Sequence, residues 1–259
     1  MTGGNPNLEP ETSESYTVGA VIDPIDGLTM TVDYWSIEID NAVGTVGTTD
    51  LIRLCATQGL YCDRTVRFSA PVSVIGQIIR VEDTNNNVGT ETYTGVDLGI
   101  VADLPSIAGG DLTFDMQATY NEETQVVTAG GLVVENLAGT VTQTYGMYAR
   151  WRALTKLNWN KGAINVSYTN RYIHGTTDEV DDFWTDKPEY TEVPEVMFQD
   201  IRVSYATDSM GTIALGITNF TDEEVPFVPS AFNANTDQEN YDLFLSLIHI
   251  SEPTRQQGI

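Results

Sequence analysis

The chain has 259 residues, and its 12 Lys and Arg against 37 Asp and Glu give a formal net charge of −25 and a pI near 4.1. A nucleic-acid binder is excluded as the default, because such proteins present a basic face to phosphates. A disordered acidic tail is also excluded, since 41% of the residues are hydrophobic and 9% are aromatic.

No apolar run approaches the roughly 18–20 residues that a transmembrane helix requires, so a helical membrane protein is excluded. The first residues, Met1–Pro10, carry neither the basic start nor the apolar stretch of a signal peptide. Transmembrane strands are not excluded, because their apolar residues occupy alternate positions and average out in a hydropathy window.

Alternation of apolar and polar residues predicts a chain built of strands, and no stretch with a helical period is long enough to compete. In chain order the predicted strands are Tyr16–Ile22, Leu28–Ala42, Thr90–Asp103, Leu112–Tyr120, Thr142–Asn158, Ile164–Arg171, Ile201–Tyr205 and Thr212–Phe220. The pattern is cleanest in Leu112–Tyr120, which has one apolar face and one fully polar face.

The links between these strands alternate in length. Short, turn-rich links are Asp23–Gly27, Pro105–Gly110, Asn160–Gly162 and Asp208–Gly211; long links are Asn41–Val88, Asn121–Val141, Gly175–Glu195 and Thr221–Tyr241. This pattern is typical of an up-and-down meander with one trimmed end and one elaborated end, as in outer-membrane barrels. A soluble sandwich with Greek-key links has no reason to sort its links in this way.

Two cysteines, Cys55 and Cys62, flank a segment that can turn back on itself at Gly59. We expect a local disulfide in an oxidising compartment, and the alternative is two free thiols in a reducing one. A zinc site is not expected, because two thiols without nearby histidines do not complete a tetrahedral ligand set.

Charged residues on the polar faces of the strands have two interpretations. The set comprises Asp97, Asp115, Arg150, Arg152, Arg171 and Arg202. In a sandwich they face solvent, whereas in a barrel they line a wet lumen. Inside a barrel the arginines have three alternatives, namely contact with a domain that fills the lumen, pairing with Asp115 across the wall, or contact with an anionic substrate, and we expect structural pairing first.

A long acidic link offers the candidate ligand contacts. Asp181 and Asp182 supply carboxylates, and Trp184 and Tyr190 supply stacking faces, for a cation or a sugar. The alternative, which we favour, is a solvated loop whose charge keeps it soluble. No metal site, cofactor or catalytic base is expected, because His174 lies at a strand end without a Ser or Asp partner in any motif.

Three motifs resemble those of TonB-dependent outer-membrane receptors and occur in the family's order. They are Gly4-Asn5-Pro6-Asn7-Leu8-Glu9-Pro10-Glu11-Thr12-Ser13, Thr94-Gly95-Val96-Asp97-Leu98, and Asn219-Phe220-Thr221-Asp222-Glu223-Glu224-Val225-Pro226-Phe227. The resemblance implies an all-β, antiparallel, up-and-down transmembrane β-barrel in the outer membrane of a Gram-negative bacterium. Such a receptor imports a siderophore, cobalamin, haem or glycan through a barrel of about 22 strands that a plug domain occludes.

The resemblance covers residues 1–244 and implies about eight strands of the C-terminal part of the barrel. The plug, and the N-terminal box that meets the TonB-type energy-coupling protein, have no counterpart in the sequence. Leu245–Arg255 looks like a translated sequencing adapter, so we expect Leu245–Ile259 to be an artefact tail. The second hypothesis is a secreted soluble β-sandwich or adhesin-like binding module. The third is a barrel enzyme of the outer membrane, for which the sequence offers no catalytic base.

Overall fold

The computed structural model describes residues 4–69, 75–128, 132–134, 136–142, 146–178, 192–209 and 211–226. The chain divides into two compact units. The first comprises Met1–Tyr16, Ser36–Thr94 and Glu123–Asn136, and the second comprises Thr17–Trp35, Gly95–Glu122 and Leu137–Ile259.

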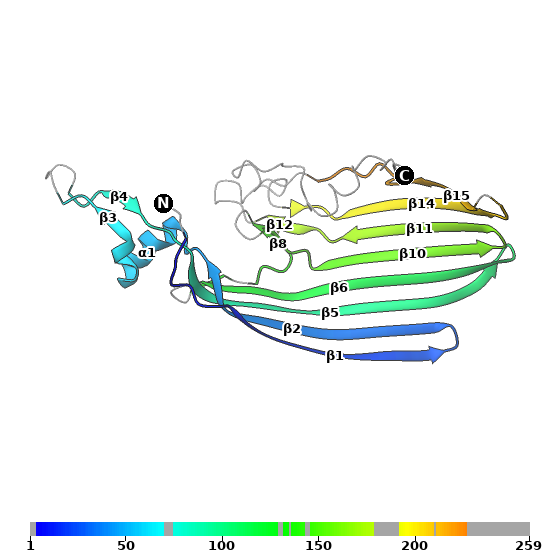
Figure 1. Ribbon diagram of the computed structural model, residues 1–259, viewed down its shortest axis with the longest axis horizontal. Helices are drawn as coiled ribbons and strands as arrows, with labels where there is room; N and C mark the ends of the chain where they lie inside the picture. The colour runs from blue at the N-terminus through cyan, green and yellow to red at the C-terminus, as the bar shows by residue number, and fades with distance from the viewer. Residues whose placement is uncertain are drawn as a thin grey trace. The chain divides into compact units, whose positions relative to one another are not determined.

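Eight long strands form the main sheet, and they follow one another in chain order (Figure 1). They are β1 (Thr12–Ile25), β2 (Leu28–Gly44), β5 (Asn86–Ile107), β6 (Gly110–Thr128), β10 (Trp151–Lys161), β11 (Ile164–Ile173), β14 (Val196–Thr207) and β15 (Gly211–Ile217). A short ninth strand, β7 (Leu132–Val134), pairs with β6. The single antiparallel meander confirms the predicted fold class and is not the pair of packed sheets of a sandwich.

The predicted alternation of short and long links is confirmed for the seven links between the eight strands. The predicted link Thr221–Tyr241 beyond residue 226 and the expected tail Leu245–Ile259 lie outside the described residues. Short links join β1 to β2, β5 to β6, β10 to β11 and β14 to β15, and long excursions join β2 to β5, β6 to β10 and β11 to β14. The short links contain glycines with positive φ, for example 78° at Gly27 and 57° at Gly162. Tight antiparallel hairpins need such residues, because their turns match the twist of the flanking strands only at positive φ.

The register between β6, β10, β11, β14 and β15 separates two faces of the sheet. One face carries apolar rows that run across all five strands, namely Phe114, Leu157, Tyr168, Ile201 and Ile217, and Leu112, Trp159, Val166, Val203 and Leu215. The other face carries polar rows between them, for example Asp115, Lys156, Thr169 and Asp200. Hydrogen-bonded pairing therefore aligns the alternation of each strand with that of its neighbours.

One row across the apolar face contains polar side chains. Asn170 lies opposite Gln199 there, one step from Tyr168. The Tyr168 hydroxyl donates to Gln199 Oε1 at 2.8 Å, and Asn170 Nδ2 lies 3.5 Å from the same hydroxyl. These polar groups thus find partners within the sheet, which hydrocarbon surroundings require.

The apolar face is exposed, with Val203 at 44% and Leu215 at 76% relative accessibility. Contiguous exposed apolar surface of this kind marks contact with a membrane or a partner. No helix in the part of the chain that the structure describes is long and apolar enough to cross a membrane.

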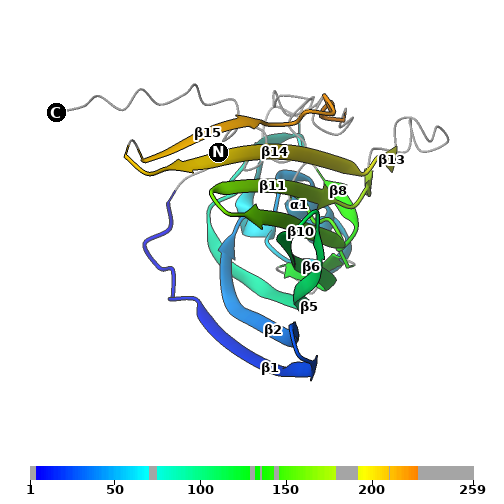
Figure 2. The ribbon, with the colours of Figure 1, turned by 90° about the vertical axis from the view of Figure 1, so that its right-hand side faces the viewer.

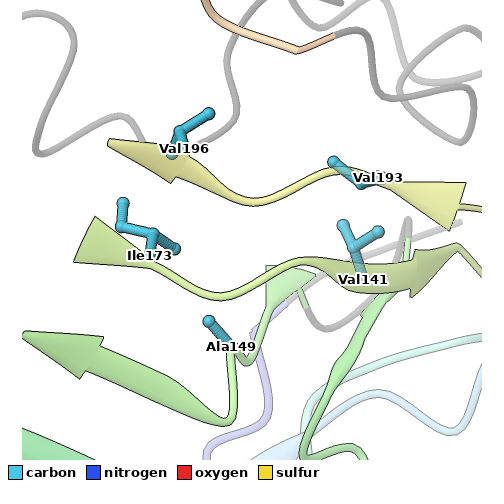
Figure 3. Close-up of a cluster of buried hydrophobic side chains, with 5 residues drawn as sticks. All are labelled: Val141, Ala149, Ile173, Val193 and Val196. Carbon is cyan, nitrogen blue, oxygen red and sulfur yellow. The ribbon is translucent and has the colours of Figure 1, made fainter. Parts of the chain in front are cut away.

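The predicted strand Thr142–Asn158 is wrong as a single element. The chain instead forms β8 (Thr140–Thr142), β9 (Gly146–Met147) and then β10. A small four-stranded sheet of order β13–β12–β8–β9 forms there, with β12 at Thr176–Asp178 and β13 at Glu192–Val193. Val141 of β8 and Val193 of β13 pack with Ala149, with Ile173 at the end of β11 and with Val196 at the start of β14 in a separate core (Figure 3). Burial of these side chains stabilises the break between β8 and β10.

The first unit contains a helix that the sequence does not predict, α1 (Thr48–Gln58). Leu51 and Leu54 are fully buried and pack with Val46 and Val81. The buried Asp83 carboxylate accepts the N–H groups of Val46 and Gly47 at 3.2 Å, which holds the chain that enters α1. Leu51, Leu54 and Cys55 follow a helical spacing, but this pattern covers little more than one turn, and tertiary contacts stabilise the helix.

The predicted disulfide between Cys55 and Cys62 is confirmed, with the two Cα atoms 4.8 Å apart. It joins α1 to the short helix η1 (Cys62–Arg64), which leads into β3 (Thr65–Arg67). Strand β3 pairs with β4 (Ile78–Val81) in a two-stranded sheet apart from the main one.

Replacement of Leu157 by Arg tests the apolar face. We expect Leu157→Arg to destabilise the chain in lipid vesicles by about 2–4 kcal/mol, because a cation at mid-membrane faces hydrocarbon. The matched control Asn158→Arg places the same cation on the polar face, and we expect it to cost little. Urea unfolding in vesicles measures both variants, and equal losses would contradict the assignment of the faces.

Replacement of both Cys55 and Cys62 by Ser tests the disulfide. Because the bond closes a short loop, we expect its loss to destabilise α1 locally by about 2 kcal/mol. Amide hydrogen exchange over Thr48–Gln58 should accelerate, while exchange in β10 and β11 stays unchanged. Unaltered exchange in α1 would show that burial of Leu51 and Leu54 alone holds the helix.

Candidate functional site

The polar face of the second unit holds a hollow of about 680 Å³. Strands β2, β5, β6, β10 and β11 line it, and the charged or polar side chains include Asp97, Asp115, Gln117, Thr119, Arg152 and Arg171. Four of the six charged residues that we expected in a lumen therefore lie together.

Two acidic residues of the hollow lie beside partners on the same face. Asp97 Oδ1 of β5 accepts a hydrogen bond from the Thr119 hydroxyl of β6 at 2.7 Å. Asp115 of β6 lies directly opposite Lys156 of β10 in the register. The cation opposite Asp115 is therefore a lysine and not one of the arginines that we expected.

Arg171 forms an ion pair on this face, and its partner is Asp200 of the neighbouring strand β14. The guanidinium Nη2 lies 3.3 Å from Asp200 Oδ2, and the two side chains are 16% and 20% exposed. The guanidinium also lies over the ring of Phe198, at 5.9 Å from its centroid. Structural pairing, our first expectation for the arginines, thus holds for Arg171, although its partner is Asp200 and not Asp115.

The other two arginines lie elsewhere. Arg202 is exposed on the polar face of β14, opposite Ser167 of β11. Arg150 precedes β10, and its guanidinium packs beside Gly139, where a Cβ would lie 2.9 Å from Nε. Arg150 Nη1 donates to the carbonyl oxygen of Glu122 at 3.4 Å. Arg150 is therefore a residue of the link before β10 and not of a wall strand.

A second hollow, of about 490 Å³, lies at the end of β11 where the long acidic link begins and returns. His174, Thr176, Thr177, Glu192 and Glu195 are among its lining residues. The Tyr172 hydroxyl donates to Glu195 Oε2 at 2.6 Å, and the His174 ring packs edge-on against Tyr172. The buried cluster of Figure 3 lies at the same strand ends, since it includes Ile173 and Val196.

The candidate ligand contacts Asp181, Asp182, Trp184 and Tyr190 lie outside the described residues. Within the described part of the chain, no group of three or more His, Cys, Asp or Glu side chains is placed to hold a metal ion. The ends of the acidic link are described, and they present carboxylates and an imidazole around an open hollow.

Sequence reasoning missed two charged residues of these sites, Lys156 and Asp200. Lys156 and Asp200 share the parity of Arg152 and Arg202 on their own strands, so the alternation rule applies to them equally. Glu195, just before β14, is the last residue of the acidic link that the sequence analysis singled out.

Strands β10, β11 and β14 lie side by side (Figure 2). Strand β11 carries Arg171, and β14 carries its partner Asp200. A rigid sheet of this kind fixes side-chain positions without help from a ligand. The polar face is thus a preformed surface with both signs of charge.

Comparison with known proteins gives a consistent result. The family model described as TonB dependent receptor-like, beta-barrel, matches residues 1–220. No curated protein sequence matches the chain.

Several solved structures are similar. The ferric enterobactin receptor PfeA of Pseudomonas aeruginosa has a TM-score of 0.56 and 14% identity over 85% of this chain and 27% of its own. The outer membrane transporter YddB of Escherichia coli has a TM-score of 0.56 and 10% identity over 85% and 30%. The FrpB iron transporter of Neisseria meningitidis has a TM-score of 0.53 and 10% identity over 87% and 28%. The chain spans less than a third of each, and these likenesses concern the fold.

A double-mutant cycle on Arg171 and Asp200 tests the ion pair. We expect Arg171→Gln and Asp200→Asn to be non-additive, with a coupling free energy of about 1 kcal/mol, because the pair is largely shielded from water. Arg202→Gln is the control, since its exposed side chain should change the free energy of unfolding by less than about 0.5 kcal/mol. Additive effects of the two substitutions in urea unfolding would argue against the pair.

Proposed function

The chain belongs to the TonB-dependent receptor-like β-barrel family, and from this premise we propose that it forms part of the wall of a receptor that binds a bulky ligand and imports it. Proteins of this family reside in the outer membrane of Gram-negative bacteria, which is therefore the location of this chain. The single observation that carries the proposal is the meander of paired strands with one apolar and one polar face.

We assign the polar face to the inside of the barrel. Water or a plug domain of the parent protein would cover it, and its mixed charges suit a polar protein surface rather than hydrocarbon. Asp97, Arg152 and Arg171 are the residues of the hollow that we expect to contact the plug. Arg202, which is exposed on the same face, is a further contact.

We assign the long links to the outside of the cell. The acidic link with Asp181, Asp182, Trp184 and Tyr190 would then contact the ligand, and the hollow beside Glu195 forms the base of this loop. The ligand is a siderophore, cobalamin, haem or glycan. The iron class receives support from the similar structures, which are described as a ferric enterobactin receptor and an iron transporter.

The proposed import is driven from the periplasm by a TonB-type partner that contacts the N-terminal region of the parent protein. We propose no enzymatic activity, because the family consists of transport receptors. The role of this chain is passive, and consists of enclosing the pathway and presenting the loops.

Uptake by the complete receptor tests the function. We expect a Gram-negative host that expresses the parent protein to take up one labelled ligand from a panel of ferric siderophores, cobalamin, haem and oligosaccharides. Uptake should require the TonB-type partner, because the family couples transport to it. The present chain alone should support no energy-dependent uptake, and such uptake by it would contradict the passive role.

Loop substitutions in the same receptor separate ligand contact from general damage. Trp184→Ala with Tyr190→Ala should weaken ligand binding about tenfold or more, since buried aromatic contacts contribute more than about 1.4 kcal/mol. Tyr205→Phe, at the end of the barrel wall that carries the short links, is the control. Equal binding by both variants would remove the acidic loop from the proposal.

A further inference from the structure

The apolar face of the main sheet carries polar side chains in its middle. Thr155 of β10, Asn170 of β11 and Gln199 of β14 are neighbours in the register, and they lie on the same face as Leu157. We call these three residues the amide row. All three side chains are partly exposed. Polar groups that face hydrocarbon are unfavourable, so the amide row needs a physical explanation.

The amide row lies near mid-depth of the membrane. On β10 the apolar face carries Trp151 at one end and Trp159 at the other, and Thr155 lies midway between them in sequence. Trp151 packs against Tyr120 of β6, with ring centroids 4.7 Å apart. Aromatic side chains of this kind mark the two interfaces of an outer-membrane barrel, and half of their separation spans about 13 Å of strand. Lipid head groups therefore lie too far away to bond to the row.

Contacts within the sheet satisfy only one end of each amide. The Tyr168 hydroxyl donates to Gln199 Oε1 at 2.8 Å, and it lies 3.5 Å from Asn170 Nδ2. In the part of the chain that the structure describes, Gln199 Nε2 and Asn170 Oδ1 have no hydrogen-bond partner. One donor and one acceptor of the amide row thus remain for a further partner.

We propose that the amide row is a lateral contact between two copies of the receptor within the membrane. The row of one copy covers the row of the other, and the Asn170 and Gln199 amides bond across the contact. The proposal rests on the proposed function for one point, the assignment of the apolar face to hydrocarbon. It adds an assembly that passage of a ligand through one barrel does not need.

Hydrogen-bond chemistry favours an uncharged protein partner over lipid. A primary amide carries donors and an acceptor, so it is complementary to another amide, whereas an acyl chain offers neither. Asn and Gln side chains bond in this way across protein contacts in membranes. Among the described residues of the rows from Trp151 to Trp159, no Asp, Glu, Lys or Arg lies on the apolar face. A charged group of a partner would therefore find no opposite charge.

Symmetry favours a second copy over an unrelated protein. Two copies in one membrane lie at the same depth, because the same aromatic side chains anchor both. A twofold axis along the membrane normal then brings the amide row of one copy to that of the other. An unrelated protein would have to present an amide at the same depth by coincidence.

The number of receptor copies per assembly tests the proposal. The complete receptor carries one fluorophore per copy and is reconstituted at low density in phosphatidylcholine vesicles, where bleaching steps are counted. We expect two steps for the wild type. Asn170→Leu with Gln199→Leu should weaken the association about tenfold or more, because the amide bonds across the contact are lost. The matched control Asn158→Leu with Asn165→Leu removes two amides from the polar face of β10 and β11 and should keep two steps.

Cross-linking gives a second readout that does not need the leucine variant. Gln199→Cys should form a disulfide-linked dimer in oxidised outer membranes, and Cys55 and Cys62 do not compete because they are already paired. Phe114→Cys is the control. It lies on the same face, but β6 is three strands from β14, about 14 Å away, so its symmetry mate is beyond the reach of a disulfide.

Single bleaching steps of the wild type would overturn the proposal. Two steps that the double leucine variant retains would also overturn it, as would a cross-link from Gln199→Cys to a different protein. Neither measurement involves transport. A single-copy receptor that still imports its ligand would remove this proposal alone, and a two-copy receptor without uptake would remove the proposed function alone.

Discussion

Every backbone N–H and C=O group that faces hydrocarbon needs a partner within the protein, and this constraint governs the main sheet. From β6 to β15 each strand pairs residue by residue with the next. Because pairing fixes register, and register fixes which face each side chain occupies, the apolar rows align across five strands. The polar face, its hollow and the Arg171 to Asp200 pair all follow from that alignment.

The sequence was sufficient for the features that repeat along the chain. Alternation located seven of the eight long strands and merged the remaining one, β10, with β8 and β9. Link lengths ordered the strands, and both signals arise from local chemistry, namely a period of two and glycines in tight turns. The disulfide between Cys55 and Cys62 was also predictable, because the two cysteines are close in sequence and Gly59 between them lets the chain turn back. The polar-face positions of Asp97, Asp115, Arg152 and Arg171 followed from the same period.

Features that depend on long-range contacts were not predictable. Helix α1 is stabilised because Leu51 and Leu54 pack with Val46 and Val81, and its helical spacing of apolar residues is too short to predict a helix by itself. The break between β8 and β10 depends on the small core around Ile173, whose members are widely separated in sequence. The partner of Arg171 is Asp200 because β11 and β14 are neighbours across a long link, which sequence spacing does not encode.

The three family motifs have architectural roles, and this limits what they say about function. In the first, Glu9 exchanges hydrogen bonds with Asn87, and Glu11 accepts the N–H of Val43. In the second, a Cβ at Gly95 would collide with the ring of Trp35, so glycine is required under that indole. In the third, Asn219 closes the chain after β15 through two bonds to Glu223, while Asp200 accepts its N–H. These contacts hold strand ends and a strand crossing in place, so the motifs identify the architecture of the wall and carry no information about the ligand.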